Sequence, residues 1–266
     1  MRARNAFALL LWAALALALA FLVIPVVAIF TNTAPHRLLA TLGEDSSLQA
    51  LRLSLETSTV AVGVIVLVGT PAAYLLATRT FPGRTVVLTL LELPLVLPPA
   101  VAGIGLLAAL GPNGILGGAL ARADIGLVLQ TAGVVVALVF VAAPFYLGQA
   151  RAAFAALAPS QLQASRTLGV GAAGTFRRVA IPLALPGLAA GLALAWGRAL
   201  GEFGATLMFA GSFRGVTQTV PLAIYDQFAT SFPSALALSA ILVIVSASLL
   251  ITVKLVIGGT PGIARS

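Results

Sequence analysis

Six long apolar stretches constrain this chain more than any other feature of its sequence. They lie at residues 6–30, 53–77, 86–110, 125–147, 186–211 and 235–257. A helix needs about 20 mainly apolar residues to cross the hydrocarbon core of a bilayer, and each stretch is long enough. Only 8% of the residues are charged, whereas a soluble domain carries about a quarter. The sequence therefore predicts an all-α polytopic membrane protein with six transmembrane helices, in a single domain over residues 1–266.

The first stretch is expected to stay in the protein as a membrane anchor. Arg2 and Arg4 provide a basic start like that of a signal peptide. The apolar run at 6–30 is nevertheless much longer than the apolar core of a signal peptide, which has about 7–15 residues. Cleavage of this segment is therefore not predicted.

Basic residues are distributed unevenly among the connections between the stretches. With a cytoplasmic N-terminus, the inner segments contain none of the seven acidic residues. They contain the arginines at positions 2, 4, 79, 84, 151, 166, 177, 178 and 265. Cytoplasmic loops are enriched in Lys and Arg, so the bias predicts that both termini are cytoplasmic. The net charge of +8 is scattered rather than gathered into a patch with aromatics, so nucleic-acid binding is not expected.

The sequence lacks the residues that most enzymes and metal sites require. There is no cysteine, and the single histidine, His36, stands alone in a polar loop. No G-x-x-x-x-G-K-[ST], G-x-S-x-G or H-E-x-x-H motif is present. We therefore expect no catalytic residues, no metal site and no ATP site on this chain.

Three ionisable residues lie deep within predicted transmembrane stretches: Glu92, Arg198 and Glu202. Charges inside a membrane are costly and usually face a partner or a polar cavity. Arg198 and Glu202 are four residues apart, so on one helix they can form an ion pair. This pair is either a structural lock between helices or part of a polar pathway, and the sequence leaves both interpretations open.

The third stretch contains "LELPLVLPPAVAGIG", in which Pro98 and Pro99 remove two adjacent backbone donors. Irregular backbone at membrane depth is tolerated only against protein or a water-filled cavity. The segment is typical either of a pathway or of a kinked helix at a close crossing.

The inner connection at 148–185 is too polar to cross a membrane. Its alanines and leucines recur at helical spacing, and Pro159–Ser160 is typical of a helix start. We predict two short interfacial helices joined by a glycine-containing turn. From composition alone, an amphipathic helix lying on the membrane is an alternative.

Within this connection, "QASRTLGVGAAGTFRRVAIP" resembles the EAA loop of importer-type ABC transporter permeases. The family pattern is E-A-A, three residues, Gly, nine residues, Ile, one residue and Leu-Pro, and its spacing is fully kept here. The sequence departs from the pattern at two positions, with Gln163 in place of Glu and Ser165 in place of the second Ala. These departures argue against a role that needs a carboxylate at position 163, but they do not affect the expected shape of the loop. The resemblance implies an ATPase-coupling loop that includes Gln163, Ala164, Ser165, Arg166, Gly169, Phe176, Arg177, Val179, Ile181 and Pro182.

The segments "LPLVLPPAVAGIGLL", "RALGEFGATLMFAG" and "TQTVPLAIY" resemble the molybdate/tungstate branch of this family. The sulfate/thiosulfate permeases are close relatives, so a sulfate permease is an alternative, and a stand-alone secondary transporter is a more distant one. The resemblance implies the MetI-like fold in a prokaryotic plasma membrane, as a homodimer in contact with membrane lipid. It further implies two cytoplasmic ATPase subunits, which would bind ATP and Mg, and an extracytoplasmic oxyanion-binding protein.

Overall fold

The computed structural model describes residues 2–258, and helices make up most of this part of the chain. The first half contains α1 (Arg2–Thr31), α2 (Pro35–Leu42), α3 (Asp45–Thr78), α4 (Arg84–Val96), α5 (Pro99–Leu110) and α6 (Gly117–Arg122). The second half contains α7 (Thr131–Ala155), α8 (Pro159–Thr167), α9 (Ala172–Thr175), the π-helical turn η1 (Phe176–Ala180), α10 (Ile181–Leu200), α11 (Gly204–Ala210), α12 (Val220–Thr230) and α13 (Phe232–Gly258).

Five helical segments are long and apolar enough to cross a membrane. They are Phe7–Thr31, Asp45–Thr78, Thr131–Ala155, Ala172–Leu200 and Phe232–Val253. The pair α4 and α5 makes a sixth span only if both helices are counted together, because they are bent by 118° at the break between them. The predicted all-α membrane fold is confirmed, and the predicted number of six is reached with this bent pair.

Three predicted segment boundaries were wrong. The stretch 86–110 is two helices, because Leu97 and Pro98 adopt extended backbone between α4 and α5. The stretch 186–211 is also two helices, since α10 ends at Leu200 and α11 begins at Gly204. The stretch predicted at 125–147 is helical only from Thr131, and its helix continues to Ala155, into the segment predicted as a connection.

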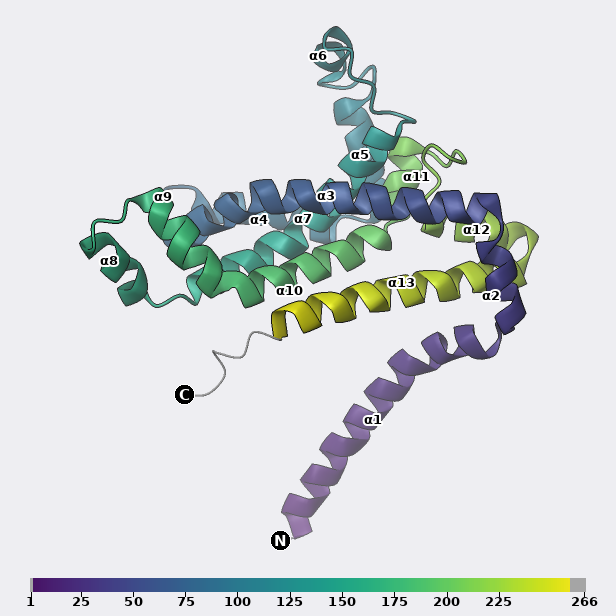
Figure 1. The fold of residues 1–266 in the computed structure, drawn as a ribbon, viewed down its shortest axis with the longest axis horizontal. Coiled ribbons are helices and arrows are strands. Elements are labelled where there is room, and N and C mark those ends of the chain that lie inside the picture. The colour runs from purple at the N-terminus through teal and green to yellow at the C-terminus, as the bar shows by residue number, and fades with distance from the viewer. Residues whose placement is uncertain (1, 259–266) are drawn as a thin grey trace.

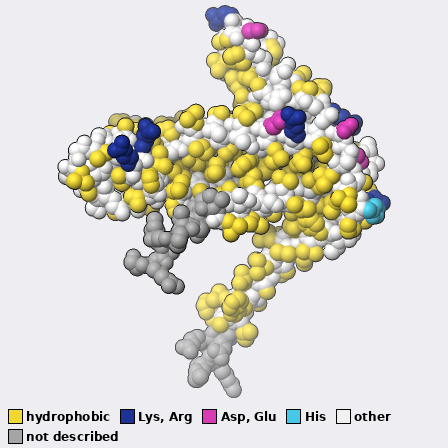
Figure 2. Space-filling model, in the orientation of Figure 1, with side chains coloured by type: hydrophobic (Ala, Val, Ile, Leu, Met, Phe, Trp, Pro, Cys, Tyr) yellow, Lys and Arg dark blue, Asp and Glu magenta, His cyan; other side chains and the backbone are white. Residues whose placement is uncertain are grey.

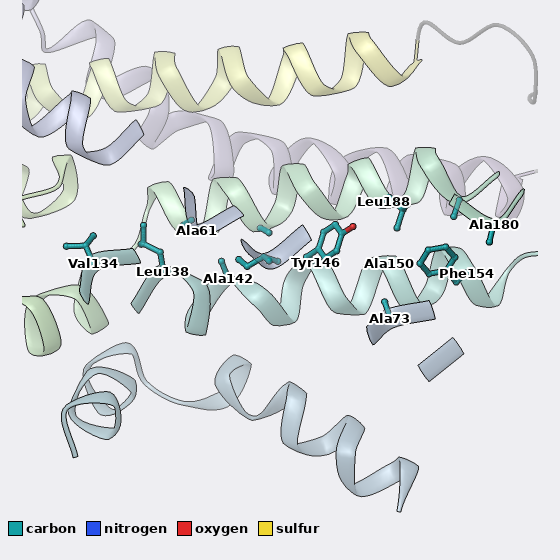
Figure 3. Close-up of a cluster of buried hydrophobic side chains, with 14 of the residues drawn as sticks. Ala61, Ala73, Val134, Leu138, Ala142, Tyr146, Ala150, Phe154, Ala180 and Leu188 are labelled. Carbon is teal, nitrogen blue, oxygen red and sulfur yellow. The ribbon is translucent and has the colours of Figure 1, made fainter. Parts of the chain in front are cut away.

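The main core lies between α3, α7 and α10, which run side by side in Figure 1. Many of its residues are alanines, which allow the helix backbones to approach closely, as is common in membrane proteins. Figure 3 shows the larger side chains of this core, including Leu138, Tyr146 and Phe154 of α7. The hydroxyl of Tyr146 forms a hydrogen bond of 2.6 Å with that of Thr70, so the buried phenol has a partner.

Helix α1 lies apart from this bundle along most of its length (Figure 1). None of its most apolar window is buried within the chain, and large side chains such as Trp12 and Phe21 are exposed. Figure 2 shows continuous apolar surface over α1 and along one side of the bundle. Such surfaces are expected on helices that contact lipid, since lipid tails are as apolar as the side chains themselves.

A second, smaller core joins the two broken spans. Ala102 and Leu106 of α5 pack with Ala205 and Phe209 of α11, and Val141 of α7 lies in the same cluster. The helices approach so closely that a Cβ on Gly103 would lie 2.7 Å from the carbonyl oxygen of Ala205 and 2.7 Å from the Cβ of Met208. The contact between α5 and α11 therefore depends on a residue without a side chain.

We expect Gly103→Ala to destabilise the protein by about 1–3 kcal/mol, the usual range for overpacking a core. Gly105→Ala is the matched control, because a Cβ at Gly105 on the same helix meets no atom within 4 Å. Thermal unfolding of the two purified variants in mild detergent measures the difference. If both variants unfold at the same temperature, the close contact between α5 and α11 is wrong.

Candidate functional site

The predicted coupling loop forms one end of the helix bundle, where α8 and α9 lie in Figure 1. Helix α8 is stopped by a glycine cap: the N–H of Val170 donates to the carbonyl of Ser165 at 3.1 Å, and Gly169 has a φ of +77°. This is the Schellman arrangement, in which the left-handed residue after a helix is usually glycine. The glycine of the EAA pattern thus lies where the chain has to turn back towards the bundle.

The second predicted interfacial helix is not separate from the membrane span that follows it. Residues from Ala172 to Leu200 form one continuous helical segment through α9, η1 and α10. The π-helical turn η1 lies between α9 and α10. Single π-helical turns within helices are frequently found at functional sites. The connection between α7 and this segment is therefore shorter than the predicted 148–185.

Ser165, one of the two departures from the EAA pattern, has a specific contact. Its side chain is buried, and its hydroxyl forms a hydrogen bond of 3.1 Å with the hydroxyl of Thr175, which is fully buried. Thr175 also donates to the carbonyl of Val170 at 3.4 Å. The serine therefore joins α8 to α9, a contact that alanine at this position cannot make.

Three aromatic rings attach the loop to the rest of the bundle. Phe176 of η1 lies 4.7 Å from Tyr74 of α3 and 6.2 Å from Phe154 of α7, measured between ring centroids. Tyr74 and Phe154 meet edge to face at 5.2 Å. Aromatic pairs at these distances are favourable beyond the area they bury, so the loop is fixed to two membrane helices. The motif included Phe176 but gave no signal for Tyr74 or Phe154, whose roles depend on tertiary contacts.

The remaining loop residues present a mixed polar and apolar surface. Gln163, Ala164, Arg177, Arg178 and Pro182 are exposed, and Val179 and Ile181 are half-buried. Leu168, in the turn after α8, is 83% exposed. The side chain of Arg166 lies outside the described part of the structure. Exposed apolar and basic side chains on the same short loop are compatible with a docking surface for another protein.

The second candidate site lies at the break between α10 and α11. Arg198 Nη2 lies 2.5 Å from Oε2 of Glu202 in an ion pair, although this oxygen accepts no well-aligned hydrogen bond. The other oxygen, Oε1, accepts a hydrogen bond of 2.6 Å from the N–H of Ala205 in the first turn of α11. Arg198 lies in the last turn of α10, whereas Glu202 lies beyond its end, because α10 stops at Leu200. The prediction that both residues share one helix was therefore wrong.

Burial distinguishes the two members of this pair. The Glu202 side chain is 1% exposed, whereas that of Arg198 is 26% exposed. Glu202 is therefore enclosed by protein, where its carboxylate satisfies a backbone donor that the broken span leaves free. Arg198 reaches the surface of the chain, so only the positive member of the pair can meet a solute.

The prolines of the third stretch belong to the same region, while Glu92 does not. A Cβ on Gly204 would lie 2.8 Å from the Cβ of Pro99, so the start of α5 packs on the start of α11. Pro98 precedes this contact in extended backbone. Glu92 instead lines a small recess with Arg151 and Pro144, between α4 and α7. The structure thus brings Pro99, Arg198 and Glu202 together and leaves Glu92 apart.

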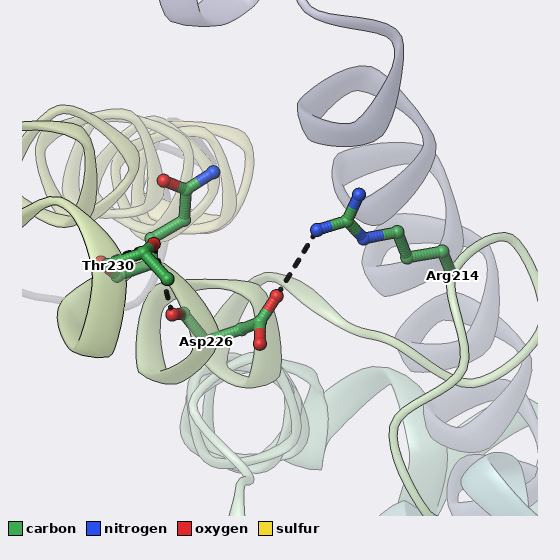
Figure 4. A network of polar contacts seen from close by, with 4 residues as sticks. Arg214, Asp226 and Thr230 are labelled. Carbon is green, nitrogen blue, oxygen red and sulfur yellow. Dashed lines mark hydrogen bonds and ion pairs between the residues drawn. The ribbon is translucent and has the colours of Figure 1, made fainter.

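A further charged pair lies at the other end of the bundle from the coupling loop. Figure 4 shows Arg214, which precedes α12, directed at Asp226 of α12, with a separation of 3.4 Å between Nη2 and Oδ2. Both side chains are exposed, so the pair contributes little to stability. Among the described residues, no three His, Cys, Asp or Glu side chains gather in a way that could hold a metal ion.

Comparison with known proteins gives a consistent result at the level of family and fold. Residues 65–257 match the family described as "Binding-protein-dependent transport system inner membrane component". The molybdenum transport system permease protein ModB of Mycobacterium tuberculosis is 42% identical over 229 residues, which cover 85% of this chain and 86% of the relative. The sulfate transport system permease protein CysW of a Synechocystis species is 33% identical over 222 residues, with 80% of each chain covered.

A crystal structure of a bacterial ABC transporter for import of the polysaccharide alginate has a chain with the same fold. It superposes with a TM-score of 0.76 and covers 98% of this chain and 97% of that chain, at 17% sequence identity. At this identity the likeness is one of fold.

We expect Glu202→Ala to destabilise the protein by about 2–4 kcal/mol, because it leaves a buried N–H without an acceptor and removes the ion pair. Glu56→Ala is a matched control, since Arg52 and Glu56 form an ion pair with the same spacing but are 80% and 56% exposed. Its unfolding temperature in detergent should stay close to that of the parent. Equal losses in the two variants would contradict a structural role for Glu202.

Proposed function

Since the chain belongs to the family of binding-protein-dependent transport system inner membrane components, we propose that it moves molybdate or tungstate into the cytoplasm. It is an ABC importer permease subunit, with several membrane-spanning helices and the MetI-like fold. Its relatives are named as transport permeases rather than enzymes, which implies an ATPase on a separate chain. In this proposal ATP and Mg bind the ATPase and not this chain.

The substrate assignment is supported by the relatives over most of the chain. The permease named for molybdenum transport is 42% identical, and the one named for sulfate transport is 33% identical. Both ions are tetrahedral divalent oxyanions, so one pathway chemistry suits both. Sulfate or thiosulfate is therefore the second candidate, and a stand-alone transporter is disfavoured because it would have no use for a coupling loop.

The single observation that carries the coupling mechanism is the construction of the loop at residues 159–182. Its outer surface exposes Leu168, Arg177 and Arg178, while its inner side is fixed by the Ser165–Thr175 hydrogen bond and by Phe176. A surface of this kind can bind an ATPase, because its exposed side chains are accessible to a partner. It can also transmit the movement of that partner, because the inner side of the loop is packed against the helix bundle. We assign this surface to two cytoplasmic ATPase subunits, one for each copy in a homodimer.

The same geometry supports our proposal of alternating access. When the ATPase subunits close, the two loops approach each other and each carries its continuous α9–α10 segment with it. The far end of α10 bears Arg198, so movement of the loop changes the position of this cation. An oxyanion delivered by an extracytoplasmic binding protein would then enter between the two copies, and ATP hydrolysis would reset the inward-open state.

We assign Arg198 to the anion pathway and propose that Glu202 holds the Arg198 side chain in place. A bare arginine binds a divalent oxyanion strongly, and a transport path has to release its ion as well as bind it. Glu202 lowers the net positive charge and restricts the arginine rotamer. Both termini are assigned to the cytoplasm of a prokaryotic cell, from the distribution of basic residues in the loops.

We expect Gly169→Val to reduce the amount of ATPase that co-purifies with this chain by about tenfold. Valine is strained at a φ of +77° by roughly 1–2 kcal/mol, so the turn that presents the loop is lost. Gly169→Asn is the matched control, since asparagine tolerates this conformation better. The measurement is affinity purification from native membranes in mild detergent, with partners identified by mass spectrometry. Purification of the unaltered chain without any P-loop ATPase would remove the basis of this assignment.

The substrate is tested in proteoliposomes that contain the complete transporter and its binding protein. We expect molybdate and tungstate to stimulate ATP hydrolysis at lower concentrations than sulfate, and Arg198→Ala to abolish the stimulation while the basal rate remains. Arg214→Ala, at an exposed pair away from the break, is the control. Stimulation by sulfate alone would transfer the assignment to the second candidate.

A further inference from the structure

Residues 99–130 leave the helix bundle as an arm made of α5, α6 and the loops around them. We refer to these residues as the α5–α6 arm. Figure 1 shows the arm projecting sideways, with α6 level with the middle of α3 and not with α2 and α12 at the end of the bundle. Its base is held by the contact of α5 with α11, whereas α6 packs mainly on α5 itself.

The short α4 and the position of α6 beside the middle of α3 indicate that the tip of the arm lies at membrane depth. Helix α4 starts at Arg84, whose guanidinium donates to the carbonyl of Leu76 near the end of α3 that faces the coupling loop. The 13 residues of α4 rise by about 20 Å, which is less than the hydrocarbon thickness of about 30 Å. Because α5 then turns by 118°, the chain runs sideways before it has crossed the membrane.

The chemistry of the tip is unsuited to lipid. Arg122 and Asp124 are both exposed there, and the connections at 111–116 and 123–130 are irregular backbone. Figure 2 shows basic and acidic side chains together at the end of the projecting arm. Neither exposed charges nor irregular backbone are stable against hydrocarbon, so protein or a protein-enclosed aqueous space has to surround this tip.

The tip is also incompletely packed by its own chain. Ile115 is 88% exposed, and Leu116 and Ile125 are about half exposed. Between α6 and the returning loop lies an open cavity of about 350 Å³, lined by Leu110, Leu120, Asp124 and Ile125 among others. An apolar ridge beside an unfilled cavity is a surface that another protein chain can complete.

We propose that the α5–α6 arm binds a second copy of this chain and forms a main part of the interface between the two copies. Among the proposed partners, the ATPase lies at the coupling-loop end and the binding protein outside the membrane, so neither reaches the middle of the bundle. The arm is also self-complementary in charge, since across a two-fold axis Arg122 of one copy can face Asp124 of the other. This inference rests on the homodimer in the proposed function and specifies the surface that builds it.

The test uses photo-cross-linking in native membranes that contain two differently tagged copies of the full chain. Ile115 is replaced by the photoreactive amino acid p-benzoylphenylalanine. We expect ultraviolet light to give a product of twice the monomer mass that carries both tags. The same replacement at Ile251 is the control, because this residue is exposed on α13, a helix that lies on the side of the bundle away from the arm in Figure 1. The control should give at least about fivefold less product, which corresponds to about 1 kcal/mol.

Two results overturn the inference. One is cross-linking of Ile115 only to lipid or to another protein, and the other is equal yields from Ile115 and Ile251. Co-purification of the two tagged copies is measured in the same membranes, so a dimer that forms without the arm is distinguished from the absence of a dimer. If the two copies co-purify but Ile115 does not cross-link them, the proposed function stands and only the assignment of the arm fails.

Charge reversal tests the orientation of the arms. Arg122→Asp and Asp124→Arg each place like charges across the proposed interface, and we expect each to lower the cross-linking yield by about tenfold. The double variant restores opposite charges and should recover most of the yield, which also shows that the altered chains fold. A double variant as weak as the single ones would contradict the two-fold arrangement.

Discussion

The close contact between α5 and α11 is the interaction on which the rest of this structure depends. Each helix follows a break in a stretch that the sequence predicted as one helix, and irregular backbone at membrane depth is stable only where protein satisfies and covers its free backbone groups. Gly103 and Gly204 allow the two helices to meet at van der Waals distance, and Glu202 provides an acceptor for a backbone N–H of α11. The two breaks therefore cover each other, with Glu202 enclosed and Arg198 partly exposed at the edge of the contact.

A single continuous segment links this site to the coupling loop. It begins at Ala172 beside Ser165 and Thr175, passes the aromatic contact of Phe176, and ends at Leu200 next to the broken span. The 20 residues of α10 extend about 30 Å, which is close to the thickness of the hydrocarbon core. A packed helix transmits displacement without being compressed, so a movement at one face of the membrane reaches Arg198 near the other.

The sequence predicted the elements that depend on local patterns and missed those that depend on tertiary contacts. Long apolar runs placed the spans, and Gly169 was identified from the EAA pattern, where the structure shows a left-handed turn after α8. The Pro98–Pro99 pair suggested the break before α5, but the break before α11 has no proline, and the buried Glu202 lies within it. The Ser165–Thr175 hydrogen bond and the Tyr74–Phe154–Phe176 contacts join segments whose pairing no local pattern reveals.

The position of the arm and the geometry of the ion pair are linked through the same two residues. Helix α5 begins at Pro99, which packs on Gly204 at the start of α11, and Glu202 lies two residues before that glycine. Any force on the α5–α6 arm is therefore applied directly beside the carboxylate that holds Arg198. If a second copy fixes the arm, it also fixes the place where the two broken spans meet. In the proposed dimer, assembly of the two copies therefore also fixes the position of Arg198, which gives the charged, irregular arm a structural role.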